Sequence, residues 1–215
     1  IKGGVCAPLG FKANGIHCGI RKNKTKEDLA LVFAECDCSA AAVYTTNKVK
    51  GAPIAVTKEN IADGYARAII CNSGNANTCN ADGVQKARRM CELAAQATGI
   101  SPEQVIVAST GVIGQILPIE PIQAGMPALA KGLSREGEEA AARAIMTTDT
   151  VVKQFAACGK IGGKSVRVGA MAKGSGMIHP NMATLLCFVT TDAEISPALL
   201  DKALRAAVAD TLNMV

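Results

Sequence analysis

Aromatic residues are scarce in this chain of 215 residues, which has no tryptophan, two tyrosines and four phenylalanines. Proteins that bind single-stranded nucleic acids stack the bases on aromatic side chains, so this scarcity argues against a nucleic-acid partner. Hydrophobic residues nevertheless make up 49% of the chain, and the core must be built mainly from alanine, valine, isoleucine and leucine. A chain of this size can fill one large domain or two small ones.

Histidine is also rare, and the cysteines follow no metal-binding spacing. The chain has only His17 and His179, it contains no Cys-x-x-Cys pair, and its nine cysteines are irregularly placed. Structural zinc sites use four such ligands, commonly in closely spaced pairs. We therefore expect no metal site, and we interpret the cysteines as buried, reduced thiols of a cytoplasmic protein.

Long apolar runs and a strong charge of one sign are missing as well. No run is long enough to span a bilayer, and the first residues resemble neither a signal peptide nor a presequence. These absences predict a soluble cytoplasmic protein without a membrane partner. The formal charge of +5 is spread along the chain. The single basic run, at residues 22–26, is followed directly by two acidic residues and indicates a solvated loop.

Apolar periodicity and turn residues predict alternating strands and helices. We expect strands at residues 29–33, 40–44, 53–56, 68–71, 105–108, 151–158, 165–171 and 185–190. We expect helices at residues 59–65, 84–98, 119–133 and 136–145, a helical turn at 101–104, and a last helix from residue 196. Gly99 is the predicted C-cap of the second helix. This alternation, without a linker or an internal repeat, indicates a layered α/β or α+β domain.

Three glycine- or hydroxyl-rich segments lie at the predicted ends of strands and helices, where binding residues of α/β proteins tend to gather. They are residues 72–77 (Asn-Ser-Gly-Asn-Ala-Asn), 109–114 (Ser-Thr-Gly-Val-Ile-Gly) and 146–150 (Met-Thr-Thr-Asp-Thr). Thr110 followed by Gly111 can present an O–H and a backbone N–H at one point, as an oxyanion hole requires. Ordinary turn and capping chemistry is an alternative explanation for each segment.

A fourth segment joins a lysine to a threonine eleven residues later. Lys173 precedes Gly-Ser-Gly, and Thr184 stands between Ala183 and an apolar run. A threonine at the start of a chain can use its own α-amine, with a pKa of roughly 7.7 to 8, as the base that activates its hydroxyl. A cut between Ala183 and Thr184 would create such a nucleophile. The residue types alone also fit a solvent-exposed lysine and a β-branched strand residue.

The motifs, taken in order, resemble those of the glutamate N-acetyltransferase family of the cyclic arginine pathway, also called ornithine acetyltransferase. The matching segments cover essentially the whole chain: residues 10–11, 28–31, 44–49, 52–53, 72–77, 109–114, 146–150, 171–177, 181–184, 191–193 and 213–215. The resemblance implies an α+β fold, a layered sandwich of the ornithine acetyltransferase and DmpA-like type. It also implies that residues 1–183 are an alpha-subunit region and residues 184–215 the start of a beta subunit whose remainder is absent from this sequence.

The resemblance further implies an activity and the residues that carry it. The precursor would cut itself between Ala183 and Thr184. Thr184 would then be the nucleophile of a ping-pong reaction that takes acetyl from N2-acetylornithine and passes it to glutamate. Thr110 and Gly111 would form the oxyanion hole, while Thr147, Lys173 and Thr184 would bind substrate. No metal or cofactor is implied, although bifunctional members also use acetyl-CoA, and the expected assembly holds two alpha and two beta subunits.

Two other interpretations stay open at this point. A self-processing N-terminal-nucleophile amidase or aminopeptidase would share the freed Thr184 nucleophile but would hydrolyse its substrate. An inactive fragment that lacks the rest of the beta subunit would fold or associate without turning over.

Overall fold

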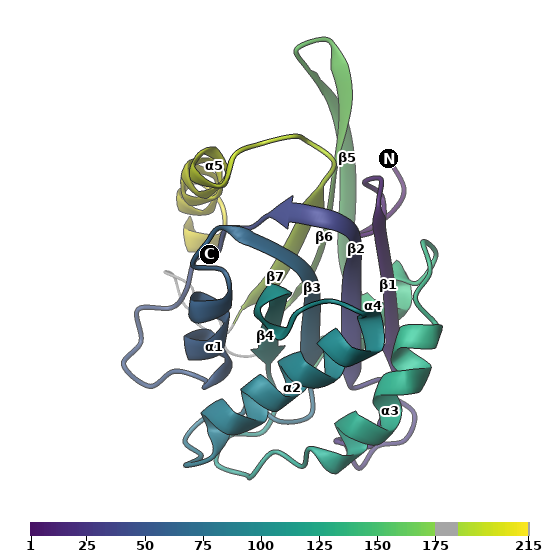
Figure 1. The fold of residues 1–215 in the computed structure, drawn as a ribbon, viewed down its shortest axis with the longest axis vertical. Helices are drawn as coiled ribbons and strands as arrows, with labels where there is room; N and C mark the ends of the chain where they lie inside the picture. The colour runs from purple at the N-terminus through teal and green to yellow at the C-terminus, as the bar shows by residue number, and fades with distance from the viewer. Residues whose placement is uncertain (175–184, 215) are drawn as a thin grey trace.

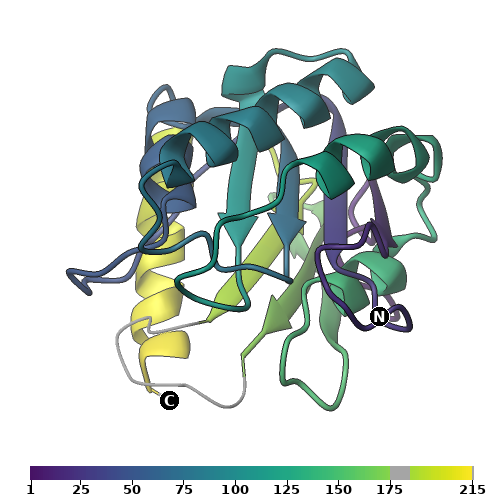
Figure 2. The same ribbon diagram turned by 90° about the horizontal axis from the view of Figure 1, so that it is seen from below.

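The computed structural model describes residues 1–174 and 185–214, which form three layers (Figures 1 and 2). The central layer is a four-stranded sheet in the order β1 (Phe11–Ile16), β2 (Leu29–Ser39), β3 (Tyr65–Asn72) and β4 (Val105–Ser109). Its neighbours run antiparallel except β3 and β4, which are parallel. The second sheet is the antiparallel set β5 (Lys153–Ile161), β6 (Lys164–Lys173) and β7 (Leu186–Thr191).

Three helices form the outer layer on one face of the central sheet (Figure 2). They are α1 (Pro53–Asn60), α2 (Gly83–Thr98) and α3 (Glu120–Lys131). Helix α4 (Glu138–Ala144) packs on β1 from the opposite face, next to the second sheet. Helix α5 (Pro197–Ala209) lies at the side of the molecule, with Pro197 against Gly64. Short 3-10 turns occupy Pro102–Gln104 and Leu212–Met214.

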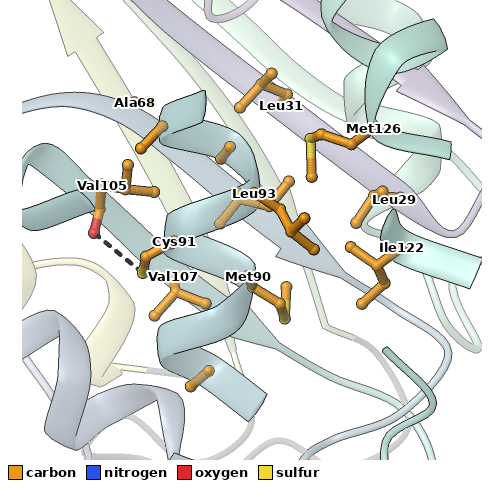
Figure 3. Packing of buried hydrophobic residues seen from close by; sticks show 14 of the residues in the cluster. Leu29, Leu31, Ala68, Met90, Cys91, Leu93, Val105, Val107, Ile122 and Met126 are labelled. Carbon is orange, nitrogen blue, oxygen red and sulfur yellow. Dashed lines mark hydrogen bonds between the residues drawn. The ribbon is translucent and has the colours of Figure 1, made fainter. Parts of the chain in front are cut away.

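The alternation of side chains along β2 divides the core in two. Leu29 and Leu31 face the helices and pack with Met90 and Leu93 of α2 and with Ile122 of α3 (Figure 3). The intervening residues of β2, Ala30 and Val32, face the second sheet and α4. Successive side chains of a strand point to opposite faces, so a strand buried on both faces reads as one continuous apolar run. The layered α+β fold predicted from the sequence is confirmed.

Most predicted elements are present with small shifts of their ends. Helix α2 matches the predicted helix, and Gly99 caps it with a left-handed backbone of φ 71°. The turn at Pro102–Gln104, strands β3 and β4, helices α3 and α4, the three strands of the second sheet and helix α5 also match. The predicted strand from Leu29 continues to Ser39, because β2 stays paired with β3 beyond a register shift.

Three expectations are wrong, and one strand was missed. Residues 40–44 form no strand, and residues 53–56 are the first turn of α1, where proline suits the first helical position. That helix ends at Asn60, and Tyr65 opens β3, so no helix covers residues 59–65. Strand β1 was not predicted, because its sequence FKANGI mixes polar residues and glycine into the apolar pattern.

Cysteine burial is only partly as expected. The nine cysteines are free thiols, but only Cys6, Cys71 and Cys91 are buried, while Cys36, Cys79 and Cys158 are exposed. The basic run at residues 22–26 is an exposed loop, as expected. In the part of the chain that the structure describes, no helix is long and apolar enough to cross a membrane.

Candidate active site

Two of the predicted polar segments lie side by side at the carboxyl ends of β3 and β4. Asn72 and Ser109 are paired at the ends of these parallel strands, and the buried amide of Asn72 donates to Ser109 Oγ at 2.6 Å. The backbone N–H of Thr110 donates to Asn72 O at 2.9 Å. A further bridge joins Asn75 to Val112. The segments 72–77 and 109–114 are therefore joined at one end of the central sheet; residues 72–77 are mostly buried, and Gly111 is exposed.

Gly111 occupies a position that only glycine fits. Its φ of +124° lies in the region that L side chains rarely adopt, and a Cβ there would be 2.7 Å from the backbone carbon of Gly74. Gly111 is exposed, and among the described residues its backbone N–H has no acceptor. A backbone N–H without an acceptor, on an exposed residue, is the kind of donor that can bind a developing oxyanion.

Lys173 reaches the segments 72–77 and 109–114 from the second sheet. It is the last residue of β6, it is only 6% exposed, and its Nζ donates to Thr110 Oγ1 at 3.3 Å. This burial excludes the alternative of a solvent-exposed lysine. Burial lowers the pKa of the Lys173 ammonium, while the nearby negative charge of Asp149 acts to raise it. The structure thus brings Thr110 and Lys173 together although 63 residues separate them.

Asp149 ties the third predicted segment to the same place. Its side chain is fully buried. It accepts hydrogen bonds from the backbone N–H of Gly174 at 2.9 Å, from the backbone N–H of Thr147 at 3.2 Å and from Lys153 Nζ at 2.5 Å. Burial alone would raise the pKa of Asp149, but these donors outweigh it and lower the pKa to about 2. Asp149 is therefore a carboxylate at neutral pH.

Thr147 is on the same turn as Asp149, and the carboxylate links it to Gly174. Among the described residues, no hydrogen bond joins the Thr147 hydroxyl to Thr110 or Lys173. Sequence reasoning named Thr147 but assigned no role to Asp149. A lone acidic residue in a run of threonines was the only available signal.

Arg21 is a second residue that sequence reasoning missed. Its guanidinium donates to Ser73 O at 2.7 Å, to Ser73 Oγ at 2.8 Å and to the carbonyl of Met146. The backbone N–H of Arg21 is held by the buried Asp28 at 2.8 Å. Arg21 thus links the 72–77 segment to the 146–150 turn. Its position just before the basic run gave no sign of this role.

Ala183 and Thr184, the predicted cleavage pair and nucleophile, lie outside the described residues. The register of the second sheet shows where the chain before and after this pair comes together. Lys173 at the end of β6 pairs with Leu186 at the start of β7, and Leu186 follows Thr184 by two positions in the sequence. The described chain on either side of the predicted cut therefore meets at Lys173.

Within the described residues, no three histidine, cysteine, aspartate or glutamate side chains are grouped closely enough to hold a metal ion. The groups at this site are a lysine, two threonines, a glycine N–H and a carboxylate that is already hydrogen-bonded. Such a set suits the binding of an anion or of a polarised carbonyl.

Comparison with known proteins decides the family. The model of the ArgJ family matches residues 12–215. The chain belongs to the ArgJ family. A curated relative from Symbiobacterium thermophilum, named arginine biosynthesis bifunctional protein ArgJ, is 52% identical over 217 residues. The match covers 100% of this chain and 54% of that relative, so this ArgJ chain spans about half the length of the curated relatives that it matches.

Two solved ArgJ structures share the fold of this chain. The ArgJ protein of Bacillus halodurans is 45% identical with a TM-score of 0.78, and the alignment covers 84% of this chain and 95% of that one. The ornithine acetyltransferase of Mycobacterium tuberculosis, solved in complex with ornithine, is 36% identical with a TM-score of 0.72 and coverage of 85% and 96%. An aminopeptidase of Ochrobactrum anthropi with an Ntn-hydrolase fold, at 12% identity and a TM-score of 0.54, shares the fold alone.

Proposed function

We propose that this chain belongs to the precursor of an acetyltransferase of arginine biosynthesis, which moves acetyl from N2-acetylornithine to glutamate. The precursor is cut between Ala183 and Thr184, so residues 1–183 form the alpha subunit and residues 184–215 begin the beta subunit. Thr184 is the nucleophile, Thr110 and Gly111 form the oxyanion hole, and Thr147 and Lys173 bind substrate. The observation that carries the proposal is the contact between Lys173 and Thr110 beside the N–H of the exposed Gly111.

The comparisons support this choice of substrate and pathway. Two curated relatives, at 52% and 45% identity, carry names that place them in arginine biosynthesis and describe them as bifunctional. A solved relative at 36% identity binds ornithine, which is the product that the first half-reaction would release. Both solved relatives are also shorter than this chain, since each is almost fully covered while part of this chain is not. A mature subunit that ends at a cleavage site would explain that difference.

Lys173 has a definite effect on the Thr110 hydroxyl. An ammonium can only donate hydrogen bonds, so Thr110 Oγ1 must accept the bond from Lys173. The hydroxyl proton of Thr110 is then free to point elsewhere, and the positive charge polarises the O–H bond and strengthens its donation. The backbone N–H of Thr110 is already bonded to Asn72 O. The two oxyanion donors are therefore the Thr110 hydroxyl and the Gly111 N–H.

The reaction consists of self-cleavage followed by two acetyl transfers. Thr184 Oγ attacks the Ala183 carbonyl, and the C–N bond breaks to give an ester of Ala183 on Thr184 Oγ and the free α-amine of Thr184. Water then hydrolyses the ester, which releases the Ala183 carboxylate and restores the Thr184 hydroxyl. The free α-amine takes the hydroxyl proton as Thr184 Oγ attacks the acetyl carbonyl of N2-acetylornithine. The tetrahedral oxyanion lies against Thr110 and Gly111. It collapses to acetyl-Thr184 and ornithine, whose amine receives the proton, and the amine of glutamate takes the acetyl by the reverse sequence.

The proposal extends to the assembly and to a second donor. The proposed mechanism uses no metal or cofactor. We propose that the enzyme acts in the cytoplasm as a complex of two alpha and two beta subunits. Acetyl-CoA is a second acetyl donor, which would account for the description of the relatives as bifunctional. An acetyl thioester would react with Thr184 through the same oxyanion and would release a thiol in place of ornithine.

Mass spectrometry of the full-length precursor that contains this chain tests the proposal directly. The wild type should give fragments that end at Ala183 and begin at Thr184, and incubation with N2-acetylornithine should add one acetyl group to Thr184. The variant Thr184→Ala should stay intact, whereas Thr211→Ala, a control at an exposed threonine, should be cut normally. An uncut wild type would refute the proposal.

The same sample separates the competing functions. Release of acetate from N2-acetylornithine, with no transfer to added glutamate, would identify a self-processing N-terminal-nucleophile amidase. A cut precursor whose Thr184 takes no acetyl from N2-acetylornithine or acetyl-CoA would identify an inactive protein.

A further inference from the structure

Lys173 carries its charge in surroundings that oppose it. The residue is 6% exposed, and burial in a medium of low polarity disfavours an ammonium. Its hydrogen bond to Thr110 is to a neutral hydroxyl, which offsets little of that cost. A lysine so placed needs a negative charge nearby if it is to stay protonated over the working pH range.

Asp149 provides that charge from an adjoining segment. Its buried carboxylate holds the backbone N–H of Gly174, the residue directly after Lys173, at 2.9 Å. The same carboxylate fixes the 146–150 turn through the N–H of Thr147. Asp149 thus holds the residue that follows Lys173 and places a negative charge near the Lys173 ammonium.

Lys153 opposes this effect from the start of β5. Its Nζ donates to Asp149 Oδ1 at 2.5 Å and remains 38% exposed. Residue 153 is paired with Ala172, the residue directly before Lys173. Lys153 therefore places a second positive charge near Lys173 and occupies the carboxylate that Lys173 depends on.

Two further groups face Lys173 from other elements. Arg21, in the loop after β1, adds positive charge and acts to lower the pKa of Lys173. Cys71 on β3 is fully buried, and burial raises the pKa of its thiol to about 12, so this group is neutral at neutral pH. The charge of Asp149 is accordingly the main one that favours the ammonium.

We infer that Asp149 and Lys153 are positioning residues that act as an opposed pair on Lys173. Asp149 keeps the ammonium charged and in place beside Thr110, and Lys153 limits that effect, so the two together set the pH above which the site loses its cation. The inference rests on the proposed function in one respect, namely that the Lys173 ammonium is needed for acetyl transfer.

Opposite substitutions test the pair in the full-length precursor. Asp149→Asn removes the negative charge but keeps an acceptor, so the titration midpoint of Lys173 should move to lower pH. Lys153→Gln removes the opposing charge and should move the midpoint to higher pH. The midpoint is measured by NMR of protein labelled with ¹³C at lysine Cε, with the Lys173 signal assigned by its loss in Lys173→Met.

Matched controls are available on the same sheet. Asp192→Asn removes a carboxylate that also accepts backbone N–H groups, those of Leu9 and Arg167. Lys164→Gln removes an exposed lysine at the other end of β6. Neither control should move the Lys173 midpoint. Midpoints that stay fixed, or that move in the same direction, in Asp149→Asn and Lys153→Gln would overturn the inference, and Lys153→Gln alone remains decisive if Asp149→Asn fails to fold.

Acetyl transfer supplies a second readout that separates the two proposals. The alkaline limb of kcat/KM for N2-acetylornithine should follow the NMR midpoint, moving down in Asp149→Asn and up in Lys153→Gln. If the midpoints move as expected but no variant, nor the wild type, transfers acetyl, the proposed function fails while the inference about Lys173 stands. A purely structural role for Asp149 would lower activity without moving the alkaline limb or the NMR midpoint.

Discussion

Replacing Thr110 by valine removes one hydroxyl at the point where the two sheets meet. Valine has nearly the shape of threonine, so the backbone bond from Thr110 N–H to Asn72 O should persist. Two interactions disappear: the proposed donation to the oxyanion, and the acceptor that Lys173 Nζ uses at 3.3 Å. The substitution therefore tests the site's chemistry and its internal packing at the same time.

The two losses have different magnitudes and different readouts. Losing one oxyanion donor typically lowers kcat by about 10²–10³, or roughly 2.7–4 kcal/mol of transition-state stabilisation. Leaving the buried Lys173 ammonium without its acceptor should cost about 1–3 kcal/mol of unfolding free energy. We expect Thr110→Val to show both effects, with the fall in kcat the larger.

The assay is single-turnover acetylation of Thr184 by N2-acetylornithine, expressed per cleaved molecule, with urea unfolding measured in parallel. The proposed self-cleavage would form its own tetrahedral oxyanion in the same oxyanion hole, so Thr110→Val would slow it too. The cleaved fraction is therefore measured first by mass spectrometry. Thr57→Val is the matched control: this buried threonine bonds to the N–H and C=O of Val107 on the helix side of the central sheet. It should lower stability and leave the acetylation rate unchanged.

A double-mutant cycle with Lys173→Met then tests whether the lysine acts through Thr110. If it does, the double variant should lose little more than Thr110→Val alone, with a coupling energy of about 0.5–3 kcal/mol. Strictly additive losses would mean that Lys173 acts only on the substrate. A wild-type rate in Thr110→Val would refute the assignment of the oxyanion hole.

Two further predictions concern stability. Gly15→Ala should destabilise the protein by about 1–3 kcal/mol in urea unfolding, because the added Cβ would lie 2.1 Å from the carbonyl oxygen of Ala140 in α4. The control Gly159→Ala, with open space around it, should change the unfolding free energy little. Equal effects of the two substitutions would contradict the close packing of α4 on β1. The contribution of the Asp149 carboxylate should be present above about pH 4 and lost as pH falls through its native pKa of about 2. The stability of the wild type over Asp149→Asn should therefore shrink by up to about 2 kcal/mol between pH 5 and pH 2, and a constant difference would show that the charged form is not favoured.

Local sequence patterns predicted most elements of the fold. They failed where the same pattern fits both a strand and a helix, or where a strand depends on its partner. The run from Pro53 to Val56 reads equally as a short strand or as a helix start, and a four-residue apolar run cannot decide between them. Residues 40–44 are an apolar run, but three of the five are alanine, which is depleted in strands, and the run has no partner strand in the described structure. Strand β1 forms because β2 offers it a ladder of pairs from Phe11 to Ile16, which no local pattern records.

In the site too, local motifs revealed some residues, while the roles of others depend on partners that are distant in sequence. Thr110 and Gly111 follow a strand within one short motif, so local reasoning and the family resemblance both reached them. The roles of Asp149 and Arg21 depend on partners that are distant in sequence, such as Gly174 for the carboxylate and Ser73 for the guanidinium. Those contacts exist only once the sheets have packed.

The pairing of β6 with β7 bears on how the two proposed subunits come to be together. The ladder runs from Val168 opposite Thr191 to Lys173 opposite Leu186, and the proposed cut falls in the connection between these strands. While the connection is intact, the strands meet as parts of one molecule, at an effective concentration on the order of millimolar. After the proposed cut they would remain neighbours through the hydrogen bonds of the ladder and through the packing of Leu186 and Phe188 in the cluster that contains Met171. A precursor is thus a device for assembly as well as for catalysis, and two halves made as separate chains would have to find each other by diffusion.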